Sequence, residues 1–515
     1  MLTAEELAGE VPDRPPSVRE HPAPGEVADF LHDESKLSAR RVESLAVPDS
    51  VGELRRVLRW HAERGHAVAV SATRTGVTGG GVPGEGAHLV SLSALRGVLH
   101  VDAEGEPPTA TVLAGTWLSE LSEWLAANHP GLEFPVDPTE RSASLGGMVA
   151  TNAGGARSYR FGSTREWVEG ITVELASGRT LRLRRGVHRA SGRVVTLRDG
   201  DQLRTLDIDA IPKPATKNAI GYGFATGGDV LDLFVGAEGT LGVVSEVTVR
   251  LLRQVESRMG FLQFFDAAQT AFAFVDALRN DASLAVTAVE FLDARSHQLA
   301  RESGKPAVDR VLGVAGDAAC SVFAEIGYVD DEGLATVVER LDAMVAAVGG
   351  DLASSLAGVT EDSLRDIRVF RHAVPEQANA VIAQRRQTHP ALHKIATDMA
   401  VTDRDLPWVH ELYRSRLSEA GLDFAIFGHV GDNHFHVNIL PRDDGELQRA
   451  RELYLSIARE VVSRGGSVSA EHGIGRLKKH FLAVQYDAAT LDAFRAVKRW
   501  ADPAWRLNPG VLLDP

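Results

Sequence analysis

The stretch S-A-T-R-T-G-V-T-G-G-G, residues 71–81, decides the fold, because it sets a glycine-rich loop directly after the apolar run Ala67 to Val70. Before that run, residues Val51 to Arg64 have a helix-like pattern, and Gly65 supplies the stop signal. The sequence therefore predicts the order helix, strand and glycine loop. Glycines in such a loop allow backbone amides to approach a phosphate closely.

Two further glycine-rich blocks follow this loop. They are S-L-G-G-M-V-A-T-N-A-G-G, residues 144–155, and G-A-E-G-T-L-G, residues 236–242, which leads into a strand from Val243 to Leu252. Three separated segments of this kind suggest one long ligand that is held along its length. The first loop is neither a G-x-G-x-x-G fingerprint nor a P-loop ending in Gly-Lys-Ser/Thr, so the common nicotinamide and ATP folds lose support.

A polar cluster lies late in the chain, in G-H-V-G-D-N-H-F-H-V-N, residues 428–438, and A-E-H-G-I-G, residues 470–475. Side chains alternate faces in an extended strand, so His434, His436 and Asn438 should share one face. Two imidazoles and a carboxylate suit a borderline divalent metal, and a further histidine can stay free as a base. The alternative is an ordinary half-buried strand, since the chain carries 18 histidines in all.

Taken in order, these segments resemble the FAD-linked oxidases of the vanillyl-alcohol-oxidase and p-cresol-methylhydroxylase (PCMH) fold, in the branch of D-lactate, glycolate and D-2-hydroxyglutarate dehydrogenases. The resemblance covers nearly the whole chain and also includes P-V-D-P at 135–138, F-R-H-A-V-P-E at 370–376 and L-N-P-G at 507–510. It implies an α+β protein with a two-subdomain FAD-binding domain of PCMH type, an antiparallel-sheet cap domain, and a C-terminal segment that returns to the FAD domain.

The expected organisation has four parts. These are an N-terminal arm at 1–39, the FAD-binding domain at 40–255, the cap or substrate domain at 256–465, and a C-terminal segment at 466–515 that completes the active site. Within the cap, the predicted elements are strands at 260–265, 285–292 and 321–328 and helices at 267–279 and 332–348. This order fits an antiparallel sheet with helices on one face.

The resemblance also implies which residues bind each cofactor. FAD would be held without covalent attachment by Thr75, Gly76, Thr78, Gly79, Asp137, Ser144, Gly147, Thr151 and Asn152, with Gly242 and Val243 near the isoalloxazine or adenine end. A divalent metal, Zn or Mn, would be held by His429, His436 and Glu471.

The implied activity is oxidation of a D-2-hydroxy acid, D-lactate-like, to the 2-oxo acid by hydride transfer to flavin N5. His472 is the candidate base, because an imidazole is largely neutral near physiological pH. Arg371 and Lys394 correspond to carboxylate-binding positions of the family, and Asn438 would hold the substrate from the strand face.

The chain departs from the family pattern in two places. Relatives usually have R-G-x-G-T in the first loop, whereas this chain has Ser71-Ala72-Thr73-Arg74-Thr75, so Arg74 either pairs with a phosphate or points outward. In the late cluster, His434 takes a position where relatives commonly have asparagine. It is either a third imidazole near the metal or a substrate contact.

Composition sets limits on partners and location. The net charge is −15 and no basic block appears, which argues against nucleic acid. No run of 18 apolar residues and no N-terminal signal pattern is present, so we expect a cytoplasmic protein, or one attached peripherally to the membrane. Cys320 is the only cysteine, which excludes an internal disulfide and a cysteine-ligated iron–sulfur cluster. Electrons would therefore leave through another partner or pass from the flavin to a diffusible acceptor. The acceptor stays open among a quinone, a cytochrome and an electron-transfer flavoprotein, and the oligomeric state stays open, with a homodimer as one alternative.

Three alternative functions stay open at this stage. A flavin oxidase that produces hydrogen peroxide would share the whole sequence pattern. A metal-dependent hydrolase would use the histidines and Glu471 to activate water, with the glycine loops on a phosphate. A catalytically idle flavoprotein would explain the altered first loop, but the intact His429, His436, Glu471 and His472 argue against it.

Overall fold

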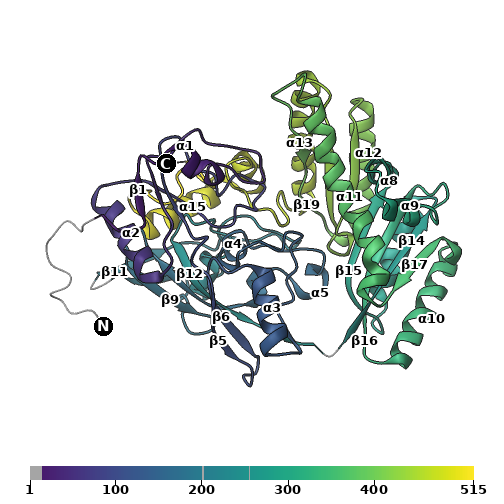
Figure 1. The fold of residues 1–515 in the computed structure, drawn as a ribbon, viewed down its shortest axis with the longest axis horizontal. Helices are drawn as coiled ribbons and strands as arrows, with labels where there is room; N and C mark the ends of the chain where they lie inside the picture. Colours follow the sequence, from purple (N-terminus) through teal and green to yellow (C-terminus); the bar gives the residue numbers. More distant parts are fainter. Residues whose placement is uncertain (1–13, 200–201, 255, 515) are drawn as a thin grey trace.

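The computed structural model describes residues 14–199, 202–254 and 256–514, which form two domains that lie side by side (Figure 1). The first domain, at the left of Figure 1, contains two larger sheets and two small two-stranded ones, β10-β11 and β13-β7, and the cap domain, at the right, contains one large sheet. Residues 1–13 of the expected N-terminal arm lie outside the described residues. No helix in the described part of the chain is long and apolar enough to span a bilayer.

The first sheet of the first domain has the strand order β1-β2-β4-β3. Its strands are β1 (Val18–Glu20), β2 (Ser44–Ala46), β3 (Val68–Ser71) and β4 (His88–Ser91); β2, β4 and β3 run parallel. Helix α2 (Val51–Glu63) precedes β3. Gly65, which follows the helix, has a left-handed backbone with φ 70°. The predicted order of helix, strand and glycine loop is therefore confirmed. Strand β1 pairs antiparallel with β2, so the expected arm contributes an edge strand to this sheet.

The second sheet is antiparallel, in the order β5-β6-β12-β8-β9. Its strands are β5 (Val98–Asp102), β6 (Thr109–Leu113), β8 (Val168–Glu174), β9 (Thr180–Arg184) and β12 (Val243–Arg250). The same domain also contains α1 (Pro24–Val27), α3 (Leu118–Asn128), α4 (Leu145–Thr151), α5 (Ser158–Phe161), α6 (Thr164–Trp167), β7 (Leu132–Glu133), β10 (Val194–Asp199), β11 (Gln202–Asp207) and β13 (Leu252–Arg253). The two larger sheets, one of four strands and one of five, agree with the predicted two-subdomain FAD-binding domain.

The cap domain is built on an eight-stranded sheet in the order β17-β14-β16-β15-β20-β21-β18, with β19 also paired to β21. All of these pairs are antiparallel. The strands are β14 (Ser257–Phe265), β15 (Ala285–Asp293), β16 (Cys320–Tyr328), β17 (Ser355–Gly358), β18 (Ile395–Ala396), β19 (Met399–Ala400), β20 (Phe424–Gly428) and β21 (His434–Ile439). The antiparallel cap sheet is thus confirmed, and Cys320 is packed in it as a buried residue.

Helices cover both faces of the cap sheet, so the prediction of helices on one face is wrong. Phe261 and Phe265 of β14 belong to the same core as α7 (Ala268–Asn280) and α10 (Asp331–Ala347). Leu262 and Phe264 belong to a second core with α8 (Ala294–Glu302), α9 (Pro306–Leu312) and α11 (Glu361–Arg385). A strand that is apolar on both sides, such as F-L-Q-F-F, is typical of a sheet covered on both faces.

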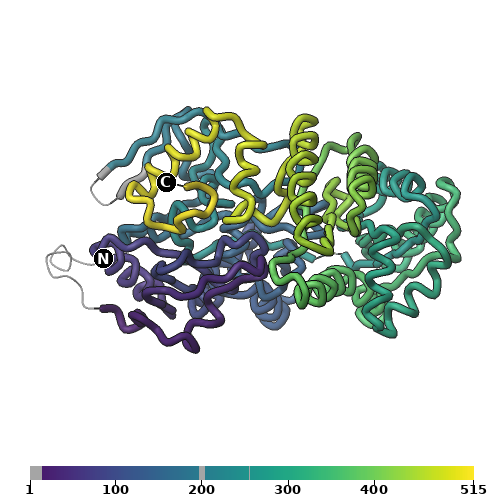
Figure 2. The backbone as a smooth tube through the Cα atoms, turned by 90° about the horizontal axis from the view of Figure 1, so that it is seen from above, coloured from purple at the N-terminus to yellow at the C-terminus, as the bar shows by residue number. Residues whose placement is uncertain are grey.

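The C-terminal segment returns to the first domain, as expected. After α12 (Leu406–Glu419) and α13 (Asp444–Ser463) in the cap, the chain forms α14 (Lys479–Gln485) and α15 (Ala488–Ala501). Figure 2 shows this yellow segment lying against the purple and teal first domain. Asn508 Oδ1 accepts a hydrogen bond from Val70 N at 2.6 Å, and its Nδ2 donates to Glu238 O at 2.7 Å. One side chain of the L-N-P-G motif thus ties β3 to the third glycine block.

Candidate functional site

A cavity of about 290 Å³ lies where the three glycine blocks meet. It is lined by the loop after β3, by the first turns of α4 and by the segment that enters β12. The blocks come from three distant parts of the chain, and the parallel strands and α4 bring them to one place. This convergence is what a single extended ligand requires.

Most of the residues expected to hold FAD line this cavity. They are Thr75, Gly76, Thr78, Ser144, Gly147, Thr151, Gly242 and Val243. Ser144 is the N-cap of α4 and accepts a hydrogen bond from Gly147 N at 3.2 Å. A Cβ on Gly146 would lie 2.6 Å from the Cβ of Ala114, so only glycine lets α4 pack this closely against the end of β6.

Gly79, Asp137 and Asn152 do not line the cavity but hold the loops around it. Gly79 has φ 77°, a conformation that side chains rarely adopt. Asp137 accepts a hydrogen bond from Arg157 N at 2.9 Å, and burial raises the pKa of this carboxyl to about 6. Asn152 Oδ1 accepts a hydrogen bond from Arg165 N at 2.9 Å. These three residues shape the cavity wall from behind.

Arg74 lines the cavity at the altered first loop. Its backbone is left-handed, with φ 58°, and its Nη1 donates to Ala72 O at 3.0 Å. The guanidinium carbon lies 4.9 Å from the centre of the Phe30 ring. The side chain is therefore folded back onto its own loop and the N-terminal strand region.

Strand β21 presents the predicted polar face. Phe435, Val437 and Ile439 are buried in the core, and Phe435 packs edge-on against Phe291 of β15 at 5.8 Å. The alternating residues His434, His436 and Asn438 face the other way, toward Glu471. The alternation is confirmed, and the polar face is a buried site.

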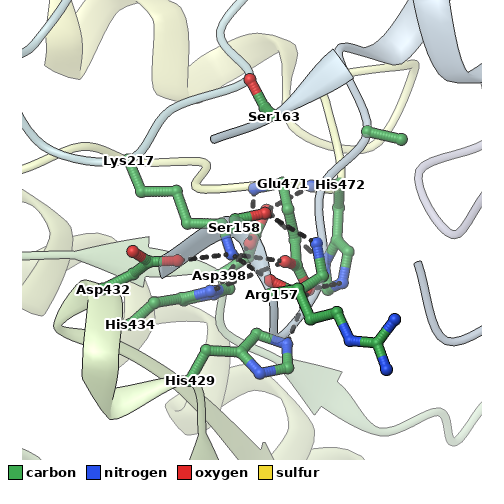
Figure 3. Close-up of polar contacts among 12 residues, drawn as sticks. Arg157, Ser158, Ser163, Lys217, Asp398, His429, Asp432, His434, Glu471 and His472 are labelled. Atoms are coloured by element: carbon green, nitrogen blue, oxygen red, sulfur yellow. Dashed lines mark hydrogen bonds and ion pairs between the residues drawn. The ribbon is translucent and has the colours of Figure 1, made fainter. Parts of the chain in front are cut away.

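Three histidines lie around Glu471, and Figure 3 labels two of them, His429 and His434. The Oε1 atom of Glu471 lies 3.4 Å from His429 Nε2 and 3.1 Å from His436 Nε2, and Oε2 lies 3.9 Å from His434 Nδ1. One donor atom from each of these four residues falls within 4.8 Å of all the others. Three imidazole nitrogens and one carboxylate oxygen are a donor set for a borderline divalent ion, so the residues fit the metal that the sequence implies.

Two residues that the sequence did not predict support Glu471 and His429. Lys217 Nζ lies 3.0 Å from Glu471 Oε2, and Glu290 Oε1 lies 3.0 Å from His429 Nδ1. Burial by itself would raise the pKa of Glu471. The charges of Lys217 and His429 outweigh this effect and hold the pKa well below its usual range. Glu471 is therefore an ionised carboxylate. Neither Lys217 nor Glu290 belongs to a motif, so no sequence signal marked them.

Asp398 is the third unpredicted residue and the most deeply buried. Its Oδ2 accepts hydrogen bonds from His472 N at 3.1 Å, Ser469 Oγ at 2.7 Å and Lys478 Nζ at 2.7 Å. The same oxygen lies 3.5 Å from His472 Nδ1. Burial lowers the pKa of His472 to about 4, so its ring is neutral. His472 and Glu471 both line the glycine-loop cavity, which joins the cavity to the histidine cluster.

The three expected substrate contacts lie in different settings. Arg371 of α11 forms an ion pair with Glu290, and its guanidinium stacks 4.3 Å from the Phe323 ring. Asn438 is buried beside the cluster, and its Nδ2 donates to no oxygen among the described residues. Lys394 is half-buried, next to β18, and it lines neither the cavity nor the histidine cluster.

Comparison with known proteins gives the same picture for both domains. Residues 42–184 match a family model described as FAD binding domain, and residues 255–512 match one described as FAD linked oxidases, C-terminal domain. A D-2-hydroxyglutarate dehydrogenase of Xanthomonas citri pv. viticola is 31% identical over 97% of this chain and 95% of its own length. A D-lactate dehydrogenase of Anaerostipes hadrus is 27% identical over 94% of this chain and 92% of its own.

A solved structure of p-cresol methylhydroxylase with bound substrate is similar in fold. It has a TM-score of 0.69 and 14% sequence identity, and the match covers 97% of this chain and 94% of that one. The likeness identifies the PCMH-type fold, as the sequence predicted.

Proposed function

The chain belongs to the family of FAD-linked oxidases, and on that premise we propose that it oxidises a D-2-hydroxy acid, such as D-lactate, to the 2-oxo acid. The observation that carries the proposal is that Glu471 and His472 line the same cavity as the three glycine blocks. A base and a cluster of metal-binding type thus stand at the wall of a cavity of FAD-binding type. Membership in a flavin family removes the support for the hydrolase alternative.

Oxidation of a 2-hydroxy acid needs a base, a group that stabilises the developing alkoxide, and an anchor for the carboxylate. FAD, bound along the glycine blocks, would accept the hydride of C2. His429, His436 and Glu471 would hold a divalent ion, zinc or manganese, which would supply Lewis acidity at the hydroxyl oxygen.

His472 is the proposed base. Its Nδ1 faces the Oδ2 of Asp398, so the proton of the neutral ring belongs on Nδ1 and the lone pair on Nε2. That lone pair takes the hydroxyl proton, and the carboxylate of Asp398 stabilises the imidazolium that forms. The arrangement resembles other histidine bases that are oriented by a buried carboxylate.

The substrate carboxylate is proposed to bind Arg371 and Lys394, with Asn438 as a neutral donor. Arg371 Nε donates to no acceptor among the described residues, and the Glu290 ion pair keeps the guanidinium close to His429. Asn438 Nδ2 is a further buried donor on the cluster side of β21. We propose that electrons leave the reduced flavin for a quinone, a cytochrome or an electron-transfer flavoprotein, that the protein is a homodimer, and that it is cytoplasmic or peripherally attached to the membrane.

The test is an anaerobic visible spectrum of the purified protein before and after addition of D-lactate, glycolate, D-2-hydroxyglutarate and the available L-enantiomers. We expect one D-acid to bleach the flavin band and its L-enantiomer to leave it unchanged. A colourless protein that cannot be reconstituted with FAD would contradict the proposal, as would a yellow protein that no hydroxy acid bleaches. Reoxidation of the flavin by oxygen, with formation of hydrogen peroxide, at a rate that supports steady-state turnover would replace the dehydrogenase by the oxidase alternative.

A further inference from the structure

We infer that His434 is a fourth protein ligand of the divalent ion, so that three imidazoles and one carboxylate bind it. The inference rests on the metal in the proposed function and assigns the residue at which this chain departs from the family pattern. The other assignment for His434 was a substrate contact. Its side chain is wholly buried and does not line the cavity, whereas His472 does. The burial of His434 therefore favours coordination of the ion over contact with the substrate.

The ring nitrogens of His434 are arranged for coordination. Nε2 lies 3.1 Å from Asp398 Oδ1, whereas Nδ1 lies 3.9 Å from Glu471 Oε2, so we assign the proton of the neutral ring to Nε2, beside the nearer carboxylate. The lone pair is then on Nδ1, which receives no hydrogen bond from any residue that the structure describes. Histidines that bind metals commonly hold their second nitrogen against a carboxylate in this way.

The mutual angles of the rings support a shared ion. A metal bond lies in the plane of its imidazole, so two rings stacked face to face do not direct their lone pairs to one point, whereas inclined neighbouring rings can. The inclinations are 86° between His429 and His436, 65° between His434 and His436, and 59° between His429 and His434. All three rings can therefore direct a nitrogen to one point.

A second histidine group in the first domain fails this criterion. His61, His66 and His88 also bring their nitrogens within 4.8 Å of one another. The rings of His66 and His88, however, are stacked at 3.8 Å and 7°, so their lone pairs lie in parallel planes and do not meet. Ring inclination therefore separates the group around Glu471 from this one. A third such group among the described residues, Asp398, His436 and His472, shares His436 with the first, and its two rings are stacked at 5.1 Å and 18°.

A third imidazole also bears on the identity of the ion. Imidazole nitrogens suit zinc, whereas manganese prefers carboxylate, carbonyl and water oxygens. With His434 as a ligand, the protein offers three nitrogens and one carboxylate, and the site favours Zn²⁺ over Mn²⁺.

The test uses the flavin-loaded protein reconstituted with Zn²⁺. X-ray absorption at the zinc edge counts the imidazole ligands, and competition with a chromophoric chelator gives the affinity. We expect three imidazoles in the wild type and two in His434→Asn, with the affinity for Zn²⁺ reduced by more than the about 10–100-fold that loss of an outer partner costs. The ratio of the affinity for Zn²⁺ to the affinity for Mn²⁺ should be smaller in the same variant than in the wild type.

Two further variants make the result specific. Asp398→Asn should weaken Zn²⁺ binding by about 10–100-fold, because His434 loses the acceptor that orients it. His410→Asn is the matched control: its ring packs against Phe435, on the opposite face of β21, at 5.9 Å. It should keep three imidazoles and the wild-type affinity.

Two results would overturn the inference without affecting the oxidation chemistry. They are a wild-type zinc site with only two imidazoles, and an unchanged Zn²⁺ affinity in His434→Asn. A wild-type protein that binds no stoichiometric ion would overturn both this inference and the metal part of the proposed function. Since the imidazole count is measured on the wild type, it decides the question even if His434→Asn fails to fold.

Discussion

The Asp398 carboxylate lies 3.5 Å from His472 Nδ1 through Oδ2, and its other oxygen lies 3.1 Å from His434 Nε2. One buried carboxylate thus faces both the proposed base and the proposed fourth ligand. Burial by itself would raise the pKa of Asp398. His472 and Lys478 outweigh this effect and hold the pKa well below its usual range, so the carboxyl group is ionised. In the arrangement that we propose, this carboxylate faces the protonated nitrogen of both rings.

Replacement of Asp398 by asparagine should slow flavin reduction. An amide can donate to Nδ1 of His472 and so favour the wrong tautomer, and we expect a loss of about 10²-fold or more in the reduction rate. The rate is measured by anaerobic stopped-flow mixing with substrate, after FAD content has been matched. Asp405→Asn is the control, because Asp405 is a buried carboxylate of the cap that pairs with Arg464 instead. A reduction rate equal to that of the wild type would remove Asp398 from its positioning role.

His472→Ala should retain FAD but lose rapid flavin reduction. General base catalysis typically contributes about 10²–10⁴-fold, and the variant should lose a factor in this range. The measurement is single-turnover bleaching of the flavin band at saturating substrate, with the unreacted spectrum as the check on FAD content. If reduction stays within a few-fold of the wild type, another group accepts the hydroxyl proton.

Removal of the metal should impair turnover without bleaching the protein. The proposed ligands lie beside the cavity wall, and only Glu471 of the four also lines the cavity, so chelation should leave FAD in place. Turnover and the visible spectrum are recorded after dialysis against a chelator, with metal content measured by elemental analysis. We expect turnover to fall with the metal content and to recover on addition of Zn²⁺. Full activity at zero metal content would exclude a role of the metal in the reaction.

Arg371→Lys should raise the Michaelis constant for the hydroxy acid by at least about tenfold. Lysine cannot form the two parallel hydrogen bonds of a guanidinium, and one charged hydrogen bond contributes about 1.5–3 kcal/mol. The control is Arg368→Lys on the same helix, where the native side chain is exposed and pairs with Glu361 at 2.6 Å. Michaelis constants of the two variants are compared under one set of conditions. Equal values would take Arg371 out of the anchor role.

Lys394 gives the proposed activity a testable pH dependence. Burial lowers the pKa of its amine to about 8, with further effects from Lys36 and Glu34. The amine is charged below that pH and neutral above it, so attraction for the substrate carboxylate is present at lower pH and lost as pH rises through about 8. The Michaelis constant should therefore increase above about pH 8. An ordinary lysine, with a pKa of about 10.4, would cause this increase only at a much higher pH.

Lys394→Arg isolates this effect, because a guanidinium stays charged throughout the range. The rise in the Michaelis constant near pH 8 should disappear in the variant. Persistence of the same rise would assign the titration to another group and exclude Lys394 as an anchor.

Local patterns predicted much of the fold. Helix α2, the strand after it and the glycine loop follow from residues that are neighbours in the chain, and so does the polar face of β21. The error in the cap has a physical reason. Residues 294–312 form two helices that cover the second face of the sheet, and the flanking strands are apolar on both sides.

The supporting residues of the site could not be predicted, because strand register places them. Ala396 pairs with Asn438 and Ala400 pairs with His434, so Asp398, which lies between them, stands opposite His436. Nothing in A-T-D-M-A marks this aspartate as special. Lys217 and Glu290 likewise reach the cluster only through tertiary packing, whereas His429, His436 and Glu471 belong to dense motifs.

The bond between Asn508 and Val70 joins positions 438 residues apart, and it supports the strand that leads into the first glycine loop. At a ribosomal rate of about 5–20 residues per second, the first loop waits about 20–90 s for its partner to be synthesised. Through that interval the edge of β3 lacks the backbone pairing that the L-N-P-G segment later provides. The first glycine loop therefore reaches its final packing only after the L-N-P-G segment, far along the chain, has been synthesised.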